Sequence, residues 1–405
     1  MADEKPTLLI AKGVMSRMGG AERDLLRRLP HLTNWYDISV ATLSSCFELE
    51  SICEQHEIKL YKPEKDWIPP QSPISQIFDS VHKSSKNSWL SCKNLISNID
   101  SFDYFHVISG DGYLAMLQLI PVYKTTHLYL LEPHRGYHED SLHRNLFGKL
   151  RRPKIITNFL LSKGRKNDLS IVKEFSLREK AIVSGNSSYT TSRIKQVYGI
   201  DCGYIHPCVD SEEYSRDVDN VTNPFTSSAQ RAYVVTIGTA NWAKGSMEVV
   251  SMLSGTDIAL AHVGGGTNHE IAILKQHAND NNVKIWIAPR LSSQQLSILI
   301  KQSLAVVSMA HKEPFGLTPI EAYSIGTPAI FVNDGGFIDS IVDGETGRLI
   351  SRTDISKWHE ALSQARVDAT RELWTHNGRL RIQELKLSPY EQAEKLHLLL
   401  QRKSK

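Results

Sequence analysis

The chain has 405 residues, with 47 Lys and Arg against 44 Asp and Glu, for a formal net charge of +3. Hydrophobic residues make up 41% and charged residues 22% of the sequence, which is typical of a globular protein and excludes a disordered or fibrous chain. This length favours two domains over a single core, and the near-neutral charge gives no indication of a nucleic-acid partner.

The chain begins with the polar and acidic residues Met-Ala-Asp-Glu-Lys-Pro, which do not resemble a signal peptide. No apolar run approaches the ~20 residues that a membrane-spanning helix needs. The five cysteines are scattered and form no CxxC pair, so we expect reduced thiols and no zinc site. These features predict a cytoplasmic protein, with peripheral contact at the inner face of the membrane as the further option.

The first predicted unit is a strand at 7–11, a turn containing Gly19 and Gly20, and a helix at 21–29, which is how a doubly wound α/β domain opens. A Gly-Gly pair at a helix start lets a phosphate approach the backbone, although such a pair is also an ordinary turn device. The turn is not G-x-G-x-x-G, and the next strand, 37–43, does not end in an acidic residue. We therefore discount a nicotinamide enzyme.

Strands and helices then alternate, which predicts a parallel sheet with ligand sites at the carboxyl ends of its strands. The predicted strands are 104–109 and 126–131, and the predicted helices are 88–99 and 113–120. Two polar groups occur at such ends: His106 with Gly110-Asp-Gly112, and Glu132-Pro-His-Arg-Gly136. The planar guanidinium of Arg135 suits phosphate or hydroxyl recognition, and His134 is either a functional side chain or a surface residue.

The stretch 142–166 carries eight Lys and Arg residues and no acid, with the apolar run 155–161 among them. One interpretation is a solvated basic face. The functional alternative is a surface that docks on anionic lipid, which would serve a lipid-linked acceptor. Nucleic acid fits less well because aromatic residues do not alternate with the basic ones.

After the polar stretch 211–231, which we predict to be a linker, the strand 233–237 ends at Gly238 and Thr239. Lys244 follows at the start of a helix. The helix dipole disfavours a lysine at that position, so its presence there predicts a function. A lysine beside two phosphates strengthens their binding and offsets charge on a leaving group.

The most informative stretch is Glu313-Pro-Phe-Gly-Leu-Thr-Pro-Ile-Glu321, between the apolar strand 304–308 and a short helix closed by Gly326. Strand, Gly-containing loop and helix start form a layout in which free N–H groups meet an anion. We predict Thr318 as the N-cap, followed by a proline in the first turn. Carboxylates on either side of the anion suit the hydroxyl-rich rings of a nucleotide sugar.

This stretch, extended through 326–336 and 343–349, resembles the nucleotide-sugar-binding segment of the retaining glycosyltransferase family 4. The resemblance continues, more weakly but collinearly, through the Gly19-Gly20-Ala-Glu-Arg segment and through Ile205-His-Pro-Cys-Val-Asp210. It implies the GT-B fold, an α/β architecture of two Rossmann-like doubly wound parallel-sheet domains facing across a cleft. The implied divisions are an acceptor-side domain, a linker, a donor domain and a C-terminal helix that packs back on the first domain: 1–210, 211–231, 232–386 and 387–405.

The resemblance also implies an enzyme that moves a hexose-like sugar from a nucleotide-diphosphate sugar to a hydroxyl acceptor with retention, without metal or other cofactor. The implied catalytic residues are His134, Lys244 and Glu313, and the implied acceptor-side residues are His106 and Arg135. The implied donor-binding residues are Gly19, Gly20, Gly238, Thr239, Lys244, Ala288, Arg290, Glu313, Phe315, Gly316, Leu317, Thr318 and Glu321.

The chain departs from the family pattern at several of these places. The family has arginine where this chain has Thr239, and often glycine where it has Pro289. By strict register the family histidine corresponds to Leu131, and His134 is three residues further on. The donor base, the sugar, the acceptor and the oligomeric state stay open. The alternatives are a nucleotide-sugar epimerase of the same fold and a catalytically weak nucleotide-sugar-binding protein.

Overall fold

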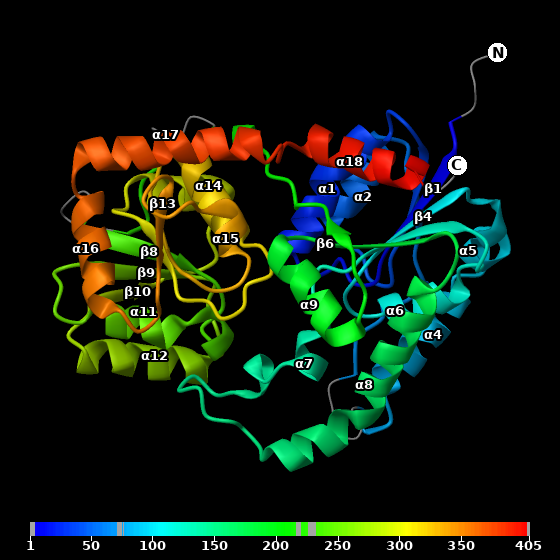
Figure 1. The fold of residues 1–405 in the computed structure, drawn as a ribbon, viewed down its shortest axis with the longest axis horizontal. Coiled ribbons are helices and arrows are strands. Elements are labelled where there is room, and N and C mark those ends of the chain that lie inside the picture. The colour runs from blue at the N-terminus through cyan, green and yellow to red at the C-terminus, as the bar shows by residue number, and fades with distance from the viewer. Residues whose placement is uncertain (1–4, 71–74, 76, 216–219, 226–231, 403–405) are drawn as a thin grey trace. The chain divides into compact units, whose positions relative to one another are not determined.

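The protein, in a computed structural model, divides into two compact units, which are coloured along the chain in Figure 1. The structure describes residues 5–70, 75, 77–215, 220–225 and 232–402. Unit 1 comprises residues 1–139, 152–208 and 389–405, and unit 2 comprises residues 140–151 and 209–388. Each unit is built around one parallel sheet, which confirms the predicted fold class.

Unit 1 contains a 7-stranded sheet in the order β3-β2-β1-β4-β5-β6-β7, with parallel pairing throughout. Its central strands are buried on both faces, which explains why they read as apolar runs without alternation. The strands are β1 Thr7–Lys12, β2 Asp37–Ala41, β3 Lys59–Tyr61, β4 Tyr104–Ile108, β5 Thr125–Tyr129, β6 Ala181–Gly185 and β7 Gly203–Tyr204.

Helices flank this sheet, and the C-terminal helix α18 packs on α1. In α18, Leu396 and Leu400 are fully buried, and His397 stacks on Trp35 with ring centroids 5.0 Å apart. The helices of unit 1 are α1 Gly20–Leu32, α2 Phe47–Gln55, α4 Ser80–Ser91, α5 Lys93–Asn98, α6 Tyr113–Leu119, α7 Arg135–His138, α8 Lys154–Ser176, α9 Ser188–Tyr198 and α18 Pro389–Arg402, with a 3-10 turn at Ile99–Ser101.

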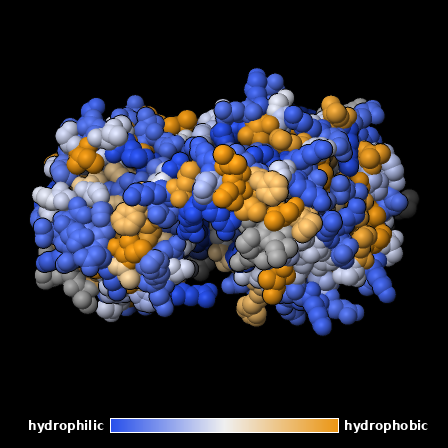
Figure 2. Space-filling model, turned by 90° about the horizontal axis from the view of Figure 1, so that it is seen from below, coloured by the Kyte–Doolittle hydropathy of each residue, from blue (hydrophilic) through white to orange (hydrophobic). Residues whose placement is uncertain are grey.

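The first two turns of α8 differ from the rest of that helix. Its buried residues begin only at Leu161, whereas Ile155, Ile156 and Phe159 are 84%, 49% and 69% exposed. Figure 2, seen from below, shows hydrophobic side chains gathered in this region with hydrophilic ones around them. This end of α8 therefore presents apolar side chains to solvent.

Unit 2 contains a 6-stranded parallel sheet in the order β10-β9-β8-β11-β12-β13. The strands are β8 Tyr233–Ile237, β9 Ala259–Val263, β10 Ile285–Ile287, β11 Val306–Ser308, β12 Ala329–Val332 and β13 Gly347–Ile350. The helices are α10 Ser211–Ser215, α11 Ser246–Leu253, α12 Asn268–Asp280, α13 Ser293–Lys301, α14 Leu317–Ile325, α15 Phe337–Ser340, α16 Ile355–Ala365 and α17 Asp368–Glu384, with 3-10 turns at Ser141–His143 and Trp242–Lys244.

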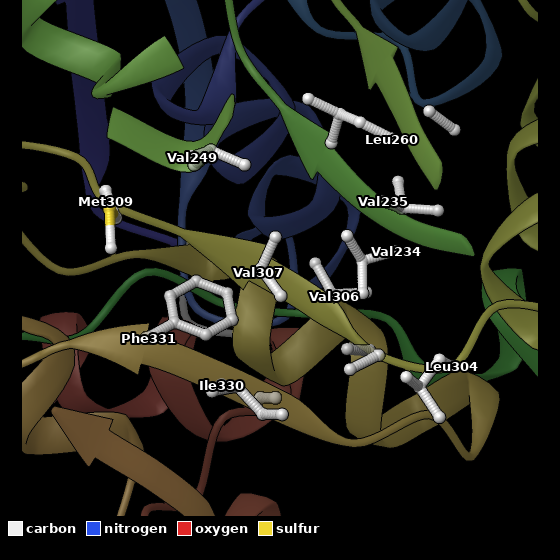
Figure 3. Close-up of a cluster of buried hydrophobic side chains, with 14 of the residues drawn as sticks. Val234, Val235, Val249, Leu260, Leu304, Val306, Val307, Met309, Ile330 and Phe331 are labelled. Carbon is white, nitrogen blue, oxygen red and sulfur yellow. The ribbon is translucent and has the colours of Figure 1, made fainter. Parts of the chain in front are cut away.

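The core of unit 2 lies on both faces of its middle strands. Figure 3 shows Val235 of β8, Val307 of β11 and Phe331 of β12 among other apolar side chains, and all three are fully buried. Burial of one such side chain contributes about 1.5–3 kcal/mol. This packing fixes the strand ends, from which the loops of the candidate site emerge.

Residues 140–151 belong to unit 2, although the chain on either side of them belongs to unit 1. Leu146 is 5% exposed and packs into the core of unit 2, and Arg151 forms an ion pair with Glu270 at 3.6 Å. The chain thus passes from one unit to the other at 139/140, 151/152, 208/209 and 388/389. We call residues 140–151 the arm.

The observed elements differ from the expected ones in three places. Helix α14 begins at Leu317 with Gly316 as its N-cap, so the prediction of Thr318 as N-cap was wrong. Residues 80–98 form α4 and α5 in place of one helix at 88–99. Of the expected linker, residues 216–219 and 226–231 lie outside the described part of the chain, and its first residues form α10, which packs on α13 and α14.

Candidate functional site

The loop that leads into α14 is shaped by a glycine that no other residue can replace without strain. Gly316 has φ +85°, and a Cβ on it would lie 2.4 Å from the ring of Phe337. With glycine as the N-cap, no side chain caps this terminus. The first-turn N–H groups and the positive end of the helix dipole are therefore available to an anion.

Gly335 and Gly336, after β12, support the same loop from the other side. The N–H of Gly336 donates to the carbonyl of Glu313 at 2.7 Å. A Cβ on Gly335 would lie 2.5 Å from that carbonyl oxygen, and one on Gly336 would lie 2.2 Å from the carbonyl oxygen of Pro314. Close backbone contact thus holds the loop in place. Phe315 is 2% exposed and packs into the core, so only its backbone can take part in a site.

Lys244 and Glu313 come together although they are far apart in the sequence. The Lys244 Nζ donates to the Glu313 Oε2 at 2.8 Å, and the two side chains are 34% and 20% exposed. The stem of Lys244 runs across Gly238, where a Cβ would lie 2.9 Å from its Cγ. β8 and β11 are neighbours in the sheet, so the loops that follow them meet at one edge.

An aromatic stack braces the loop that carries Lys244. Trp242 lies parallel to His311 with ring centroids 3.7 Å apart, and His311 Nε2 lies 2.7 Å from Glu248 Oε1. On the arm, the Arg144 guanidinium lies 4.9 Å from the centroid of the Trp242 ring. The sequence analysis missed this stack because its members are separated by long stretches of chain and carry no motif.

Glu321 lies more than one turn inside α14 and is 5% exposed. Its Oε1 accepts a hydrogen bond from the Tyr214 hydroxyl of α10 at 2.7 Å. Tyr214 is itself 7% exposed, so the pair is well shielded from water. The sequence analysis did not predict a role for Tyr214, because it interpreted the whole stretch after residue 210 as a linker.

The other residues of unit 2 that were predicted to bind the sugar donor differ in their exposure to solvent. Thr239 and Arg290 are exposed, and Ala288 is buried with its N–H donated to the carbonyl of His262 at 2.8 Å. The His262 ring is buried, and this burial lowers its pKa to about 4. It is therefore neutral at physiological pH.

In unit 1, the expected glycine pair stands at the start of α1. Gly19 is the N-cap, and its N–H donates to the Glu22 side chain at 3.0 Å. Glu22 in turn lies 3.3 Å from the Nζ of Lys12. This terminus is therefore occupied by an internal carboxylate that is paired with a lysine.

His106 lies inside the sheet of unit 1 and not at a surface. It is 1% exposed, its Nδ1 lies 2.9 Å from the Nδ1 of His127, and the Nε2 of His127 lies 2.7 Å from the Ser184 hydroxyl. Burial lowers the pKa of both imidazoles, that of His127 to about 3. We therefore remove His106 from the acceptor-side residues, since its ring completes an internal hydrogen-bonded row.

His134 and Arg135 follow β5, as expected, but have different surroundings. Arg135 lies 3.0 Å from Glu132 and 4.0 Å from Glu139, so its charge is already balanced. The His134 ring stacks on Tyr137 with centroids 4.0 Å apart, and burial lowers its pKa. Of this pair, His134 lines a pocket, and its Nδ1 has no hydrogen-bond partner among the described residues.

Residues 217–381 match the family described as Glycosyl transferases group 1. That stretch is therefore similar to the group 1 glycosyltransferases over about two fifths of the chain. It contains the Lys244–Glu313 pair and Glu321, and the match supports glycosyl transfer as its chemistry. The finer assignment to family 4 stays a prediction.

Curated relatives match over limited stretches. Glycogen synthase of Mycobacterium tuberculosis is 24% identical over 192 residues, 46% of this chain and 45% of the relative. The capsular polysaccharide biosynthesis glycosyltransferase CapM of Staphylococcus aureus is 27% identical over 145 residues, 34% of this chain and 32% of that protein. The D-inositol 3-phosphate glycosyltransferase of Corynebacterium diphtheriae is 36% identical over 80 residues, 20% of this chain and 18% of that protein. The chain thus aligns with about half, or less, of these relatives' length.

Solved structures match over nearly the whole chain. A glycosyltransferase from Rickettsia africae has a TM-score of 0.70 at 15% identity, with 99% of both chains covered. Anabaena HepE in complex with UDP and glucose has a TM-score of 0.70 at 14% identity, with 98% of this chain and 100% of HepE covered. These likenesses show the fold, which is GT-B.

Proposed function

We propose that this protein is a retaining glycosyltransferase, which moves a hexose-like sugar from a nucleotide-diphosphate sugar to a hydroxyl acceptor. The observation that carries the proposal is the Lys244–Glu313 pair beside the uncapped start of α14. A single lysine, a carboxylate and a free helix terminus converge there within the matched region. This is the combination that a diphosphate joined to a sugar requires.

The pair suggests how the donor is received. Without donor, Glu313 balances the charge of Lys244. When the diphosphate occupies the start of α14, the Lys244 ammonium exchanges its carboxylate partner for phosphate oxygens, and Glu313 becomes free to accept hydrogen bonds from sugar hydroxyls. Binding thus converts an internal ion pair into two contacts with the donor.

In the transfer step, the bond between the anomeric carbon and the diphosphate oxygen breaks, and its electron pair leaves with the diphosphate. The acceptor oxygen bonds to the anomeric carbon on the same face, and its proton passes to the leaving phosphate oxygen. Lys244 and the dipole of α14 stabilise the negative charge that develops there. These groups supply the positive charge that we propose in place of a metal ion.

Glu321 is proposed to accept hydrogen bonds from the ribose hydroxyls, with Tyr214 fixing the rotamer of its carboxylate. Because HepE is described with UDP and glucose, uridine nucleotides are the first donors to test. Hexosyl transfer in polysaccharide biosynthesis is the setting that the named relatives suggest for this chain.

The exposed end of α8 supports a proposal of contact with an anionic membrane surface. Ile155, Ile156 and Phe159 can enter the lipid interface, while lysine and arginine side chains around them meet lipid phosphates. The exposed basic residues of unit 1 in this region are Arg152, Lys154, Lys163 and Lys166. Among the described residues, no helix is long and apolar enough to cross a bilayer. Peripheral binding at the cytoplasmic face would bring the enzyme to a lipid-linked acceptor.

The test is a thermal-shift panel of nucleotide sugars, followed by NMR of the products. A donor at 100-fold its dissociation constant stabilises the protein by about 2.7 kcal/mol. Transfer with retained anomeric configuration supports the proposal. Isomerisation of the donor in the absence of acceptor would instead indicate an epimerase, and tight donor binding without turnover would indicate a binding protein.

A further inference from the structure

A pocket opens in unit 1 at the carboxyl ends of β4 and β5. Its cavity volume is about 30 Å³, and its walls come from the turn after β4 and from the first turns of α4, α6 and α7. This is the edge of a parallel sheet at which ligands bind. Its polar side chains are Asp79, His82, Asp111, His134 and Tyr137.

The wall formed by Tyr137 depends on a glycine in the middle of α8. A Cβ on Gly164 would lie 2.7 Å from the Tyr137 hydroxyl oxygen. An alanine at this position would therefore displace the Tyr137 ring. The Arg165 Nε also donates to the carbonyl of Tyr137 at 2.8 Å. Glycine disfavours a helix interior, and the place it leaves for Tyr137 accounts for its presence in this one.

Behind the pocket, Asp168 is fully buried and collects three partners. Its carboxylate accepts hydrogen bonds from the hydroxyls of Tyr113 and Tyr198 at 2.9 and 2.7 Å, and His138 Nε2 lies 2.7 Å from it. This group joins α6, α8 and α9 to α7. These hydrogen bonds hold in place the helices that form the back of the pocket.

Among the lining side chains, Asp79 already accepts a hydrogen bond from Asn167 at 2.7 Å, whereas two imidazole nitrogens lack a partner in the described part of the chain. The His134 Nδ1 is buried without a hydrogen bond among the described residues, and so is the Nδ1 of His82. Since a buried N–H without an acceptor is costly, the His134 proton is best placed on Nε2. That nitrogen then acts as a donor toward a ligand oxygen.

The charged side chains that line the pocket are acidic, and Lys86 lies near enough to His82 to lower its pKa. Burial lowers the pKa of both His82 and His134, so both imidazoles are neutral, while Asp79 and Asp111 supply carboxylates. The nearby Lys12 is occupied: its Nζ donates to the Ser109 carbonyl at 2.8 Å and lies 3.3 Å from Glu22. Arg135, as described above, is balanced by two glutamates.

We propose that this pocket receives the uncharged, hydroxyl-bearing end of the acceptor, a neutral sugar or polyol, and rejects phosphorylated or carboxylated sugars. The inference rests on the proposed glycosyl transfer and names its acceptor class. Sugar hydroxyls donate to Asp79 and Asp111, and a hydroxyl oxygen accepts from His134. An anionic group would meet two carboxylates with no free cation among the lining residues that the structure describes.

The first experiment uses the full-length protein and no donor. Saturation-transfer NMR compares neutral methyl hexosides with glucose 6-phosphate and glucuronate as probes. The inference predicts binding of at least one neutral hexoside at least 10-fold tighter than either anion. A preference for an anionic sugar, or the absence of binding by any neutral one, would overturn it.

The second experiment replaces a carboxylate that lines the pocket. Asp111→Asn should weaken the neutral sugar at least 10-fold and raise the acceptor KM, with the donor KM unchanged. Asp201→Asn, which removes an exposed carboxylate elsewhere in unit 1, is the matched control and should change neither. An unchanged acceptor KM in Asp111→Asn contradicts the inference. Failure of nucleotide sugars to bind the wild-type protein would contradict the proposed function alone, because the NMR measurement uses no donor.

Discussion

The candidate site in unit 2 and the pocket in unit 1 are built by opposite means. In unit 2 a helix terminus and one lysine offer positive charge, and glycines let the backbone form the binding surface. In unit 1 side chains from separate elements form the walls, and two carboxylates make them negative. If both proposals hold, this difference sorts ligands by charge, with the diphosphate binding in unit 2 and an uncharged, hydroxyl-bearing group binding in unit 1. The following predictions test that contrast.

The largest effect is expected for Lys244→Ala. Removing the cation that faces the leaving diphosphate should lower kcat by about 10²–10³-fold, as loss of one preorganised electrostatic contact typically does. Steady-state transfer assays measure it. Lys275→Ala, at an exposed lysine of α12, should leave kcat unchanged. A kcat for Lys244→Ala within about threefold of wild type would remove this lysine from the mechanism.

Gly316→Ala tests whether the α14 terminus depends on glycine. The new methyl group would meet the Phe337 ring and would stand at positive φ, so we expect a loss of about 2–4 kcal/mol in the free energy of unfolding. Gly255→Ala is the control, because it has φ +80° and nothing within 4 Å of the added Cβ. Urea unfolding should give a loss of only about 1–2 kcal/mol for the control. Equal losses would show that the contact with Phe337 is unimportant.

The Phe159→Ser variant tests whether unit 1 binds to a lipid surface. The side chain is 69% exposed, so folding stability should hold, while binding to vesicles with anionic lipid should weaken by about 10-fold through lost apolar burial. Leu177→Ser, at an apolar side chain that is 83% exposed at the other end of α8, should bind like wild type. Sedimentation with vesicles provides the measurement. Equally weakened vesicle binding in both variants would indicate non-specific hydrophobic binding and not a surface at the start of α8.

The smallest effect is expected for Tyr214→Phe, which removes the hydrogen bond to Glu321 and leaves the ring in place. Loss of one such bond corresponds to about 1 kcal/mol, so calorimetry should show donor affinity reduced about fivefold. Glu321→Ala should cost about 1–3 kcal/mol because ribose hydroxyls lose their acceptor. Tyr204→Phe, at an exposed tyrosine of unit 1, serves as control. Donor affinity in Tyr214→Phe equal to that of the control would show that Tyr214 does not orient Glu321.

The sequence was most informative where neighbouring residues carry the structure. Apolar runs bounded by glycine gave the parallel strands, and the meeting of Lys244 with Glu313 follows because β8 and β11 are adjacent in such a sheet. The Thr318 cap failed for a reason outside its own segment. The Phe337 ring leaves no room for a side chain at residue 316, and the helix starts at the next residue with Gly316 as its N-cap.

Contacts across long stretches of chain could not be predicted in the same way. Tyr214 reaches Glu321 from a short helix whose sequence reads as a linker. His106 was misjudged although a signal existed, since it pairs with His127 in register on the next strand. Histidine is the third residue of both observed strands, β4 and β5, and this register places the two rings in one buried row. The stretch 142–166 was interpreted as one basic surface, but Leu146 in it is buried.

The arm has a practical consequence for anyone who would separate the two halves. A cut between residues 208 and 209 would leave the second half without Leu146 in its core, and Trp242 would lose the guanidinium of Arg144. The first half would retain residues 140–151 with nothing to pack against. Expressing the halves as two polypeptides should therefore yield a folded unit 2 only when a peptide of the arm is added back. Limited proteolysis within the arm should lower the folding stability of unit 2 as well as that of unit 1.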